Sequence, residues 1–570
     1  MIQMSGFLSD DRSAGHEGAT SRCSSLRGTW PRLVVLLLAV GWVWGVPRAH
    51  ATVPPGDSTG SLQKYWIFLD ARPGPTASSA TARWTQPVAR SYLDRLRKIE
   101  VRPLARSRWF HAVSARLSDA TRAVVAGLPF VRKTRPVAAL TPASVPSAER
   151  TAMPVRPEDA PSTPRPAPGA LKGPLSRINA LPPLERGLNG HGVRVGFLDA
   201  HFAGLRHPAF AALRTDGRLA GLRSFTDRRQ GGNHGVGVVS VTAGYAPGTL
   251  VGPAYGATVL GATTEYTQFE RNVEEDNFVA GLEWLSRQGA DVVNVSIGYT
   301  TFDDGQRSYS PADLDGDTAL TTRAVDRAAR LGVTVVVSAG NSGCATPDSC
   351  WYYVNTPADA DSAIAVGAVA PDSSLASFSA RGPTADGRRK PDVLVQGQQV
   401  PAAWNDGQYA RVGGTSFASP KVTGIVAQML QVNPSLGPIE VRRLLRQTAS
   451  QAHAPDTTRG WGIVNADAAV RAAEWNARRT PPSTLQVSPP YRAVGHSSLV
   501  VPVSAPPHTA ALRVSLVTPL GRQVRHAKRT AHPGPNRLAL DVSSLPAGIY
   551  RYDVATDTEH HATGTVTITE

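Results

Sequence analysis

The sequence predicts an α/β protein whose main domain is a doubly wound, mostly parallel sheet, with a small α+β domain before it and a β-sandwich after it. Three observations support this fold class. From about residue 193, apolar strands alternate with helical patterns. A shorter pattern of strand, helix, strand, helix and strand precedes them. From residue 484, short alternating strands separated by turn signals follow.

Residues 1–51 predict an export signal. The stretch LVVLLLAVGWVWGV, residues 33–46, is apolar but shorter than the roughly 20 residues of a membrane-spanning helix. Arg27 and Arg32 precede it, and Ala49-His50-Ala51 has the small-x-small pattern that a signal peptidase cleaves. We therefore expect a secreted protein, extracellular or at the cell surface, cleaved near Ala51. A single anchoring helix is the alternative.

Residues 52–140 predict the small α+β domain, and residues 141–174 predict a cleavable linker behind it. Apolar residues alternate in the strands of the domain and recur at helical spacing in its helices, the second of which Ser118 caps. The linker is dense in Pro, Ala, Ser and Thr and buries too little apolar surface to fold. The expected strands are 64–69, 109–117 and 131–137, and the expected helices are 88–99 and 119–128.

The charge distribution argues against a nucleic-acid partner. The formal net charge is +16, but residues 1–170 carry 23 Lys and Arg against 11 Asp and Glu, and the rest of the chain carries 37 against 33. The excess therefore lies mostly in segments that we expect to be removed. The remainder has no marked basic helix and no alternation of aromatic and basic residues.

The central domain, expected over residues 175–474, has the pattern of a parallel sheet covered by helices on both faces. Ligands of such sheets bind at the carboxyl ends of the strands, where Asp199, Ser296 and Asn341 lie. The expected strands are 193–199, 257–262, 291–297, 333–340 and 362–369, and the expected helices are 277–287, 321–331 and about 417–431.

Four residues offer the groups that amide hydrolysis at neutral pH requires. Ser416 closes the run GGTS and precedes a helix, whose N-terminal dipole favours developing negative charge on a nucleophile. His234 begins another helix and can act as the base, while Asp199 ends the first strand and can orient that base. Asn341 ends VVVSAGN with an amide that can point at an oxyanion.

Each of these four residues lies in one of six blocks, which are VRVGFLD, NHGVGVVS, DVVNVSIG, VVVSAGNSG, FSARGPTADGRRKPDV and GGTSFASP; the third block contains Ser296 instead, and the fifth contains none of the candidates. In type and order the blocks resemble the subtilase family of serine peptidases, peptidase family S8, over about residues 175–474. The resemblance implies a subtilisin-like fold with Ser416 as nucleophile, His234 as general base and then acid, and Asp199 orienting the imidazole. It also implies an oxyanion hole made by Asn341 and the N–H of Ser416.

Two places depart from the family's usual residues. Ala200-His201 follow the aspartate where a Thr or Ser and a Gly are usual, and Val236-Gly237 stand where Thr-His is usual after the histidine. No position of the triad is lost.

The resemblance also implies two backbone walls that pair with an extended peptide and flank its P1 side chain. The walls are Ser296, Ile297 and Gly298 and, facing them, Ser338, Ala339 and Gly340. The floor of the pocket is expected within Tyr353 to Pro357, where the alignment is loose. The preferred P1 residue is therefore not predicted.

Asp313, Asp315 and Asp317 in PADLDGDT have the alternate spacing that can surround Ca²⁺, an ion that many subtilases carry. The distant glutamate of an EF-hand loop is missing, so an ordinary solvated acidic loop is the alternative. Catalysis itself is expected to require no cofactor, and calcium would be structural.

Cys344 and Cys350 lie six residues apart in a Gly-, Pro- and Ser-containing loop. In an exported chain this spacing predicts one small disulfide. Two free thiols are the alternative.

The flanking domains also have resemblances. Residues 52–140 resemble the inhibitory propeptide that assists the folding of subtilases. Beyond a linker at 475–483, residues 484–570 look like the sorting domain of substrates of the bacterial type IX secretion system, on the runs TPLGRQV and LPAGIYRYDV. Such domains often end in basic residues, whereas this chain ends TVTITE, so an ordinary cell-surface or substrate-binding β-sandwich stays open.

The sequence thus predicts a secreted serine endopeptidase, monomeric and made as a self-processed precursor. Its expected partners are protein or peptide substrates and its own propeptide, with membrane contact only through the export signal. An inactive scaffold that only binds is the alternative, and the four intact residues argue against it. An esterase lacks support because Phe417 and Ala418 follow Ser416, so the G-x-S-x-G elbow is missing.

Overall fold

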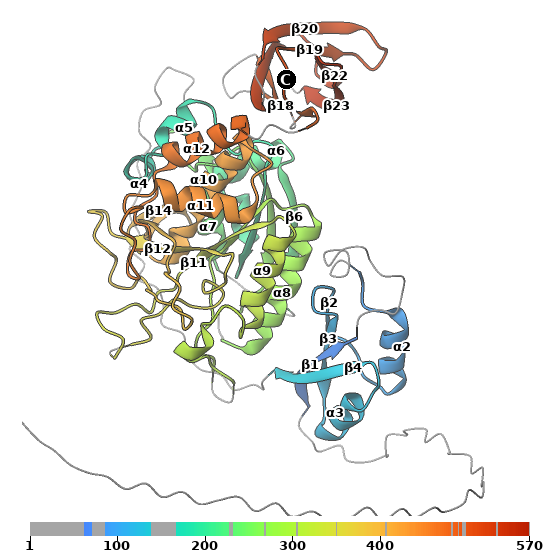
Figure 1. Cartoon of the computed structure of the whole chain (residues 1–570), viewed down its shortest axis with the longest axis vertical. Coiled ribbons are helices and arrows are strands. Elements are labelled where there is room, and N and C mark those ends of the chain that lie inside the picture. Colours follow the sequence, from blue (N-terminus) through green and yellow to red (C-terminus); the bar gives the residue numbers. More distant parts are fainter. Residues whose placement is uncertain are drawn as a thin grey trace, which may run out of the picture. The chain divides into compact units, whose positions relative to one another are not determined.

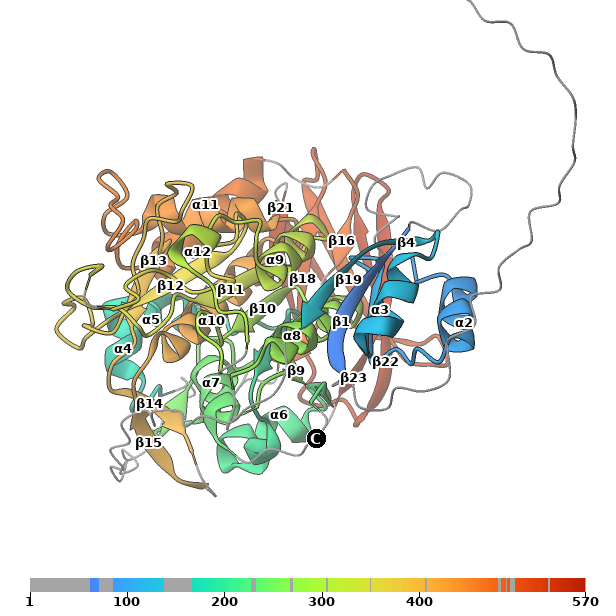
Figure 2. The same cartoon turned by 90° about the horizontal axis from the view of Figure 1, so that it is seen from below.

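The computed structural model (Figures 1 and 2) describes residues 62–70, 86–137, 167–226, 232–266, 270–303, 306–348, 350–404, 407–479, 483–487, 490–492, 498–531 and 534–568. The chain divides into two compact units, residues 1–52 and 53–570. All the described residues belong to the second unit. The expected export signal and residues 141–166 of the expected linker lie outside the described residues.

The N-terminal domain is a four-stranded antiparallel sheet in the order β2-β3-β1-β4, with two helices packed on it. Ile67, Leu96, Val113 and Val125 belong to its own apolar core, and Ser118 caps the second helix by accepting a hydrogen bond from the N–H of Thr121 at 3.1 Å. The elements are β1 (Gln63–Leu69), α2 (Arg90–Lys98), β2 (Ala105–Ser107), β3 (Ala112–Leu117), α3 (Asp119–Ala126) and β4 (Val131–Val137).

The central sheet has seven parallel strands in the order β13-β12-β11-β10-β5-β9-β6. The inner strands are buried on both faces because helices cover both of them. Successive residues of β5 alternate between the two resulting cores: Phe197 belongs to the core that includes residues of α7 and α10, and Leu198 belongs to the core that includes residues of α8 and α9. The strands are β5 (Arg194–Asp199), β6 (Leu219–Ser224), β9 (Thr258–Thr263), β10 (Val292–Val295), β11 (Thr334–Ser338), β12 (Ile364–Val369) and β13 (Val393–Gln396).

The helices on the sheet include two that run side by side on one face, α8 and α9 (Figure 1). The principal helices are α7 (His234–Ala243), α8 (Asn272–Arg287), α9 (Leu320–Arg330), α10 (Ser419–Val432), α11 (Pro438–Thr448) and α12 (Ala466–Arg479). Shorter elements are α4 (Lys172–Arg177), α5 (Leu181–Glu185), α6 (Ala211–Thr215) and the hairpins β7 (Tyr245–Ala246) with β8 (Leu250–Val251) and β14 (Val400–Ala403) with β15 (Tyr409–Val412). Helices α4 and α12 thus extend into segments that we expected to be linkers.

The C-terminal part folds as two small antiparallel sheets around one apolar core that includes Val501, Val514 and Leu538. One sheet contains β16 (Gln486–Val487), β17 (Tyr491–Arg492), β18 (Ser498–Ala505) and β21 (Gly534–Asp541), and the other contains β19 (Ala511–Val517), β20 (Gln523–Thr530), β22 (Gly548–Thr556) and β23 (His561–Ile568). The predicted fold class is therefore confirmed.

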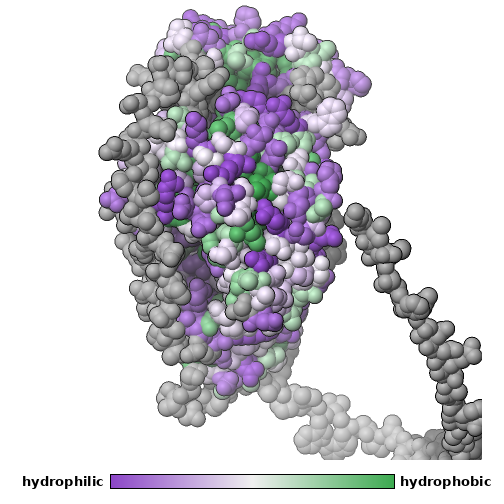
Figure 3. Space-filling model, turned by 90° about the vertical axis from the view of Figure 1, so that its left-hand side faces the viewer, coloured by the Kyte–Doolittle hydropathy of each residue, from purple (hydrophilic) through white to green (hydrophobic). Residues whose placement is uncertain are grey.

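The surface drawn in Figure 3 mixes residue types. Among the coloured residues of that face, hydrophobic ones lie in small groups separated by hydrophilic ones. Within the part of the chain that the structure describes, each helix is too short or too polar to cross a lipid bilayer.

Candidate active site

Asp199 and His234 are joined by a hydrogen bond at the carboxyl end of the sheet. Asp199 is the last residue of β5 and is fully buried, and His234 is the first residue of α7. Nδ1 of the imidazole lies 2.8 Å from Oδ1 of the carboxylate, which also accepts a hydrogen bond from the N–H of Ala200 at 2.7 Å. This contact fixes the ring and leaves its other nitrogen, Nε2, available to a second partner.

Opposing effects act on the pKa of His234. Burial disfavours the charged imidazolium and lowers the pKa, while the negative charge of Asp199 and the hydrogen bond to it raise the pKa. The result is a pKa above the usual value of 6.5. The imidazole is therefore a stronger base than a free histidine, as proton abstraction requires.

Gly235 allows α7 to begin this close to β5. A Cβ placed on Gly235 would lie 2.3 Å from the carbonyl oxygen of His201 and 3.1 Å from Oδ1 of Asp199. Both neighbours are held by the end of β5, so neither can move away easily. A residue with a side chain at position 235 would therefore clash, so the contact between His234 and Asp199 requires glycine there.

Ser416 lies in η5 (Thr415–Phe417), directly before α10, and is 8% exposed. Its hydroxyl donates a hydrogen bond to the carbonyl oxygen of Ser296 at 3.1 Å. The described hydrogen bonds do not join Ser416 to His234. The next residue, Phe417, does contact the histidine, with ring centroids 5.2 Å apart.

Asn341 follows β11 and faces the same turn. Its Oδ1 accepts hydrogen bonds from the N–H and the hydroxyl of Thr415, at 2.8 and 2.9 Å. With the oxygen occupied, Nδ2 is free to donate elsewhere, and a Cβ on Gly414 would lie 3.3 Å from this nitrogen. Gly414, with φ of +136°, adopts a backbone conformation that side chains disfavour and opens the approach to Ser416.

A buried polar network behind Ser416 was not predicted from the sequence. The hydroxyl of Ser296 donates to the carbonyl oxygen of Ser416 at 2.8 Å and lies 3.1 Å from the hydroxyl of Ser419. Asn294 donates to Ser296 at 2.8 Å and accepts from Thr423 at 3.0 Å. These bonds tie the turn that carries Ser416 to the end of β10.

The two predicted backbone walls lie where β10 and β11 end. Ser296, Ile297 and Gly298 directly follow β10, and Ser338, Ala339 and Gly340 are the last residue of β11 and the two after it. Between them, the structure places the segment Asn355-Thr356, within the stretch where the pocket floor was expected. The N–H of Asn355 donates to the carbonyl oxygen of Ala339 at 2.8 Å, and the N–H of Tyr299 donates to that of Thr356 at 2.8 Å.

The two departures from the family pattern have structural consequences. Gly237 makes room for aromatic rings, because a Cβ there would lie 3.1 Å from both Phe417 and Trp404. Ala200 offers no hydroxyl to the aspartate, and Oδ2 of Asp199 is buried without a hydrogen-bond partner among the described residues.

The carboxylates of the acidic loop accept hydrogen bonds from groups of the same loop. Asp313 accepts from the N–H and hydroxyl of Ser310 at 2.8 and 2.7 Å, and Asp315 accepts from the N–H groups of Asp317 and Thr318 at 2.9 and 2.7 Å. Across the described ranges of the chain, no group of three or more His, Cys, Asp or Glu residues could hold a metal ion. Asp313, Asp315 and Asp317 therefore do not fit a calcium site, and an acidic loop capped by its own backbone fits them better.

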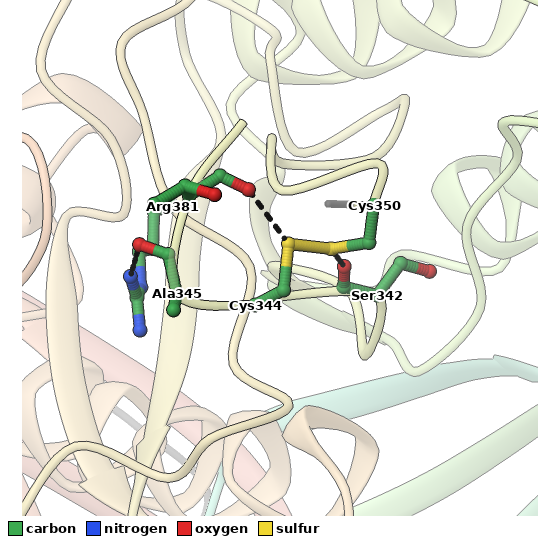
Figure 4. The surroundings of a disulfide bond; sticks show 6 residues. Ser342, Cys344, Ala345, Cys350 and Arg381 are labelled. Atoms are coloured by element: carbon green, nitrogen blue, oxygen red, sulfur yellow. Dashed lines mark hydrogen bonds between the residues drawn. A yellow bond between two sulfur atoms is a disulfide. The ribbon is translucent and has the colours of Figure 1, made fainter. Parts of the chain in front are cut away.

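Cys344 and Cys350 form a disulfide bond in the loop after Asn341 (Figure 4). Their Cα atoms lie 6.1 Å apart, within the usual range for a disulfide. The guanidinium of Arg381 donates to the carbonyl oxygen of Ala345 at 3.3 Å, next to the first cysteine.

Residues of the N-terminal domain contact carboxylates on α8. Lys64 forms an ion pair with Asp276 at 2.6 Å, and the indole N–H of Trp66 donates to the same carboxylate. Glu283 accepts from the hydroxyl of Ser107 and from the N–H groups of Arg108 and Trp109, the latter two at 3.1 and 3.3 Å. Both carboxylates are buried, and burial raises the pKa of each above its usual value.

Comparisons with known proteins agree with this geometry. The model of the subtilase family, peptidase S8, matches residues 190–462. The chain is 31% identical to Subtilisin Savinase of Lederbergia lenta over 303 residues, which cover 52% of this chain and 97% of that protein. It is 32% identical to Subtilisin DY of Bacillus licheniformis over 299 residues, covering 50% of this chain and 93% of the relative.

The solved structure of a mutant of the epidermin leader peptide processing serine protease from Staphylococcus aureus is similar in fold. The TM-score is 0.53 with 16% sequence identity, and the match covers 72% of this chain and all of the other. Fold, site and relatives together define a serine endopeptidase. The chain belongs to the subtilase family.

Proposed function

We propose that this endopeptidase is exported, is made as a self-processed precursor, and hydrolyses peptide bonds through Ser416, His234 and Asp199. The observation that carries the proposal is the 2.8 Å hydrogen bond between His234 and Asp199 beside the turn of Ser416. It supplies an oriented base with a raised pKa next to a hydroxyl at the start of a helix.

The chemistry begins with the hydroxyl of Ser416. This hydroxyl exchanges its hydrogen bond with Ser296 for one to Nε2 of His234 and attacks the substrate carbonyl carbon while its proton passes to the imidazole. Asp199 stabilises the imidazolium that results. The imidazolium then gives the proton to the leaving amine as the peptide bond breaks, and water repeats the sequence on the acyl-enzyme to free Ser416.

The oxyanion formed by this attack needs donors that are already in place. Nδ2 of Asn341 is one, because Thr415 holds the other end of the amide. The N–H of Ser416 is the second, since N–H groups in the first turn of a helical segment have no acceptor within that segment.

The precursor proposal concerns residues outside the catalytic core. Residues 1–51 would direct export, and residues 52–140 would act as the inhibitory propeptide, supported by their contacts with Asp276 and Glu283. Residues 484–570 would serve in sorting to the cell surface, and the mature enzyme would act as a monomer on protein substrates. The small β-sandwich formed by residues 484–570 is compatible with a role in sorting.

The test uses the full chain, expressed in a secreting bacterial host. We expect the secreted product to react with a fluorophosphonate probe at Ser416 and to digest casein. Labelling without digestion of any protein would favour an esterase, and neither labelling nor digestion would favour an inactive scaffold.

A further inference from the structure

The second sheet of the C-terminal part, formed by β19, β20, β22 and β23, has an outer face that is turned away from the apolar core. Side chains alternate along its strands, and one set lies in the core: Leu512, Val514, Leu516, Tyr552 and Val554. Residues between them, such as Arg513 and Arg551, are exposed. The strand pairing therefore defines which side chains share the outer face and which of them are neighbours.

Two cations lie opposite each other on this outer face. Arg513 of β19 is paired with Lys528 of β20, and both side chains are exposed. Neither forms an ion pair with another described residue. Asp557, a carboxylate near Lys528 at the rim, accepts hydrogen bonds from the N–H of Ala510 at 3.2 Å instead. Like charges directly opposite each other destabilise an antiparallel sheet, so an anion held between them would offset their repulsion.

Protection of the sheet edge explains part of the positive charge but not this pair. Cations on an edge strand hinder the addition of another chain, and β20 is an edge strand. However, β19 and β22 are paired on both sides, and they carry Arg513 and Arg551. The four strands together hold five Lys and Arg against one Asp, whereas β18 and β21 of the other sheet hold one Arg and one Asp. The excess of positive charge thus belongs to one sheet.

The groups around the two cations are small and polar. The strand pairing places four of them in the neighbouring positions of the outer face: His526, Ser515, Thr563 and His561. Asp553 also lies on this face, and Arg551 neutralises it in an ion pair at 3.0 Å. The described outer positions of these strands offer no Phe, Tyr or Trp, and their one large apolar side chain is Ile549, near the start of β22.

These side chains discriminate between three kinds of anionic partner. Binding at a membrane surface requires a set of apolar side chains that enter the lipid, and single-stranded nucleic acid stacks its bases on aromatic rings. The face provides neither. Imidazoles, hydroxyls and two unpaired cations instead match the carboxylates, sulfates and hydroxyls of an acidic polysaccharide, since hydrogen bonds from cations to such anions are strong.

We propose that the outer face of β19, β20, β22 and β23 binds an acidic polysaccharide, with a carboxylate or sulfate of the polymer between Arg513 and Lys528. Such binding retains the peptidase on an acidic matrix. The inference goes beyond the proposed function, because binding at this sheet requires no catalysis.

The test is a lysine footprint of the full chain as Ser416→Ala, which should keep its terminal domains because it cannot process itself. Acetylation by an N-hydroxysuccinimide ester, read by mass spectrometry, measures Lys528 separately from the basic N-terminal domain. The probes are alginate, which carries carboxylates, dextran sulfate, and neutral dextran. Single-stranded DNA and vesicles of phosphatidylcholine with phosphatidylserine represent the other two partners. Lys172, exposed on α4, is the internal reference.

Alginate and dextran sulfate should both protect Lys528 and leave Lys172 reactive, while dextran should protect neither; the polymer that protects at the lower concentration identifies the preferred anion. In Arg513→Ala, the alginate concentration that halves the reactivity of Lys528 should rise about fivefold, the upper worth of one contact between exposed charges. The matched control is Arg389→Ala, which changes an exposed arginine of the peptidase domain and should leave that concentration unchanged. Sodium chloride should weaken the protection, because the contacts are exposed.

Lack of protection of Lys528 by both acidic polymers, or equal protection by neutral dextran, would overturn the inference even if Arg513→Ala failed to fold. So would protection by the vesicles or the DNA at lower mass concentrations than by the polysaccharides. An unchanged half-protecting concentration in a folded Arg513→Ala chain would also overturn it, because the opposed cations would then not bind the polymer.

Discussion

Thr415 donates two hydrogen bonds to Oδ1 of Asn341, one from its N–H at 2.8 Å and one from its hydroxyl at 2.9 Å. Because Thr415 is also the residue before Ser416, the turn that presents the hydroxyl also orients the amide proposed for the oxyanion hole. The hydroxyl of Thr415 lies 3.2 Å from the N–H of Gly340 as well, so the second wall is tied to the same turn. A shift of this turn would therefore disturb nucleophile, oxyanion donor and pocket wall together.

The first prediction concerns Asn341. Asn341→Ala should lower kcat by roughly 10² to 10³, the loss seen when the oxyanion-hole amide of subtilisin is removed, with KM nearly unchanged. Thr415→Val removes only one of the two bonds that orient Asn341 and should cost about tenfold in kcat. Steady-state kinetics on one peptide check both values, and a near-normal kcat for Asn341→Ala would remove this residue from the oxyanion hole.

Ser416→Ala should abolish proteolysis and self-processing while the fold persists. The substitution deletes one oxygen, whose hydrogen bond among the described residues is to the carbonyl oxygen of Ser296, so little packing is lost. Full-length precursor should accumulate, with a circular dichroism spectrum like that of the wild-type precursor. Normally trimmed product from a purified Ser416→Ala preparation, free of other proteases, would contradict the assignment.

Asp199 should determine the pH at which activity is lost on the acidic side. Only neutral His234 accepts the proton of Ser416, so activity is lost as pH falls through the pKa of His234. Because Asp199 raises that pKa, the midpoint of the acidic limb in kcat/KM should lie above 6.5. Asp199→Asn removes the charge and should move the limb to lower pH, with kcat reduced by about 10⁴.

The measurement is a pH profile of kcat/KM from pH 5 to 9 for both enzymes. A flat wild-type profile, with chemistry shown to limit the rate, would argue against a histidine base. An acidic limb that stays at the same pH in Asp199→Asn would show that the carboxylate does not control His234.

Gly235→Ala should damage both stability and activity. The new Cβ would stand 2.3 Å from the carbonyl oxygen of His201, so the start of α7 must move, at a cost of about 1 to 3 kcal/mol in the free energy of unfolding. The displaced His234 should also react more slowly with a fluorophosphonate. Gly437→Ala, where nothing lies within 4 Å of the new Cβ, is the matched control for thermal unfolding. Equal midpoints for the two variants would contradict the steric argument.

Much of the fold was predictable because a strand of a parallel sheet that is buried on both faces appears in the sequence as an unbroken run of apolar residues. The five expected strands of the central sheet all exist, each within a few residues of its predicted bounds. The two outermost strands were missed. Most of β6 (LAGLRS) is exposed or half-exposed, so its apolar pattern is weak, and β13 spans four residues just after a proline. Similarly, β2 (ARS) is three residues long and has no apolar alternation.

The site was predictable to the extent that its residues stand in contiguous motifs. The structure brings Asp199 to His234, and Asn341 to the turn of Ser416, as the blocks suggested. Thr415 belongs to the predicted motif GGTS. Its hydrogen bonds to Asn341 could not be predicted, because they depend on the three-dimensional arrangement of two segments that are distant in the sequence. For the pocket floor the sequence indicated only the stretch Tyr353 to Pro357, because the residue that lies between the two walls is set by backbone hydrogen bonds to Ala339 and Tyr299.

The contacts of Glu283 bear on the proposed propeptide. One buried carboxylate on α8 accepts three hydrogen bonds from Ser107, Arg108 and Trp109, so it holds the start of the loop between β2 and β3. Hydrogen bonds to a charged acceptor are worth roughly 1.5 to 3 kcal/mol each, more than neutral ones. Glu283 should therefore contribute strongly to any affinity between residues 52–140 and the domain behind them.

We predict that residues 52–140 act as an intramolecular chaperone and a temporary inhibitor, and that Glu283 mediates both effects. A parallel sheet of distant strands closes long loops before its contacts form, so a preformed surface against α8 should speed folding. The test refolds residues 171–570 with and without a peptide of residues 52–140 and follows activity with time. The peptide should raise the yield of active enzyme and then inhibit that enzyme until the peptide is digested.

With Glu283→Ala, inhibition by the peptide should be about 10- to 100-fold weaker. Glu185→Ala, which changes an exposed glutamate, should behave as the wild type. Equal yields with and without peptide, and no inhibition of the wild-type enzyme, would give the N-terminal domain some other role.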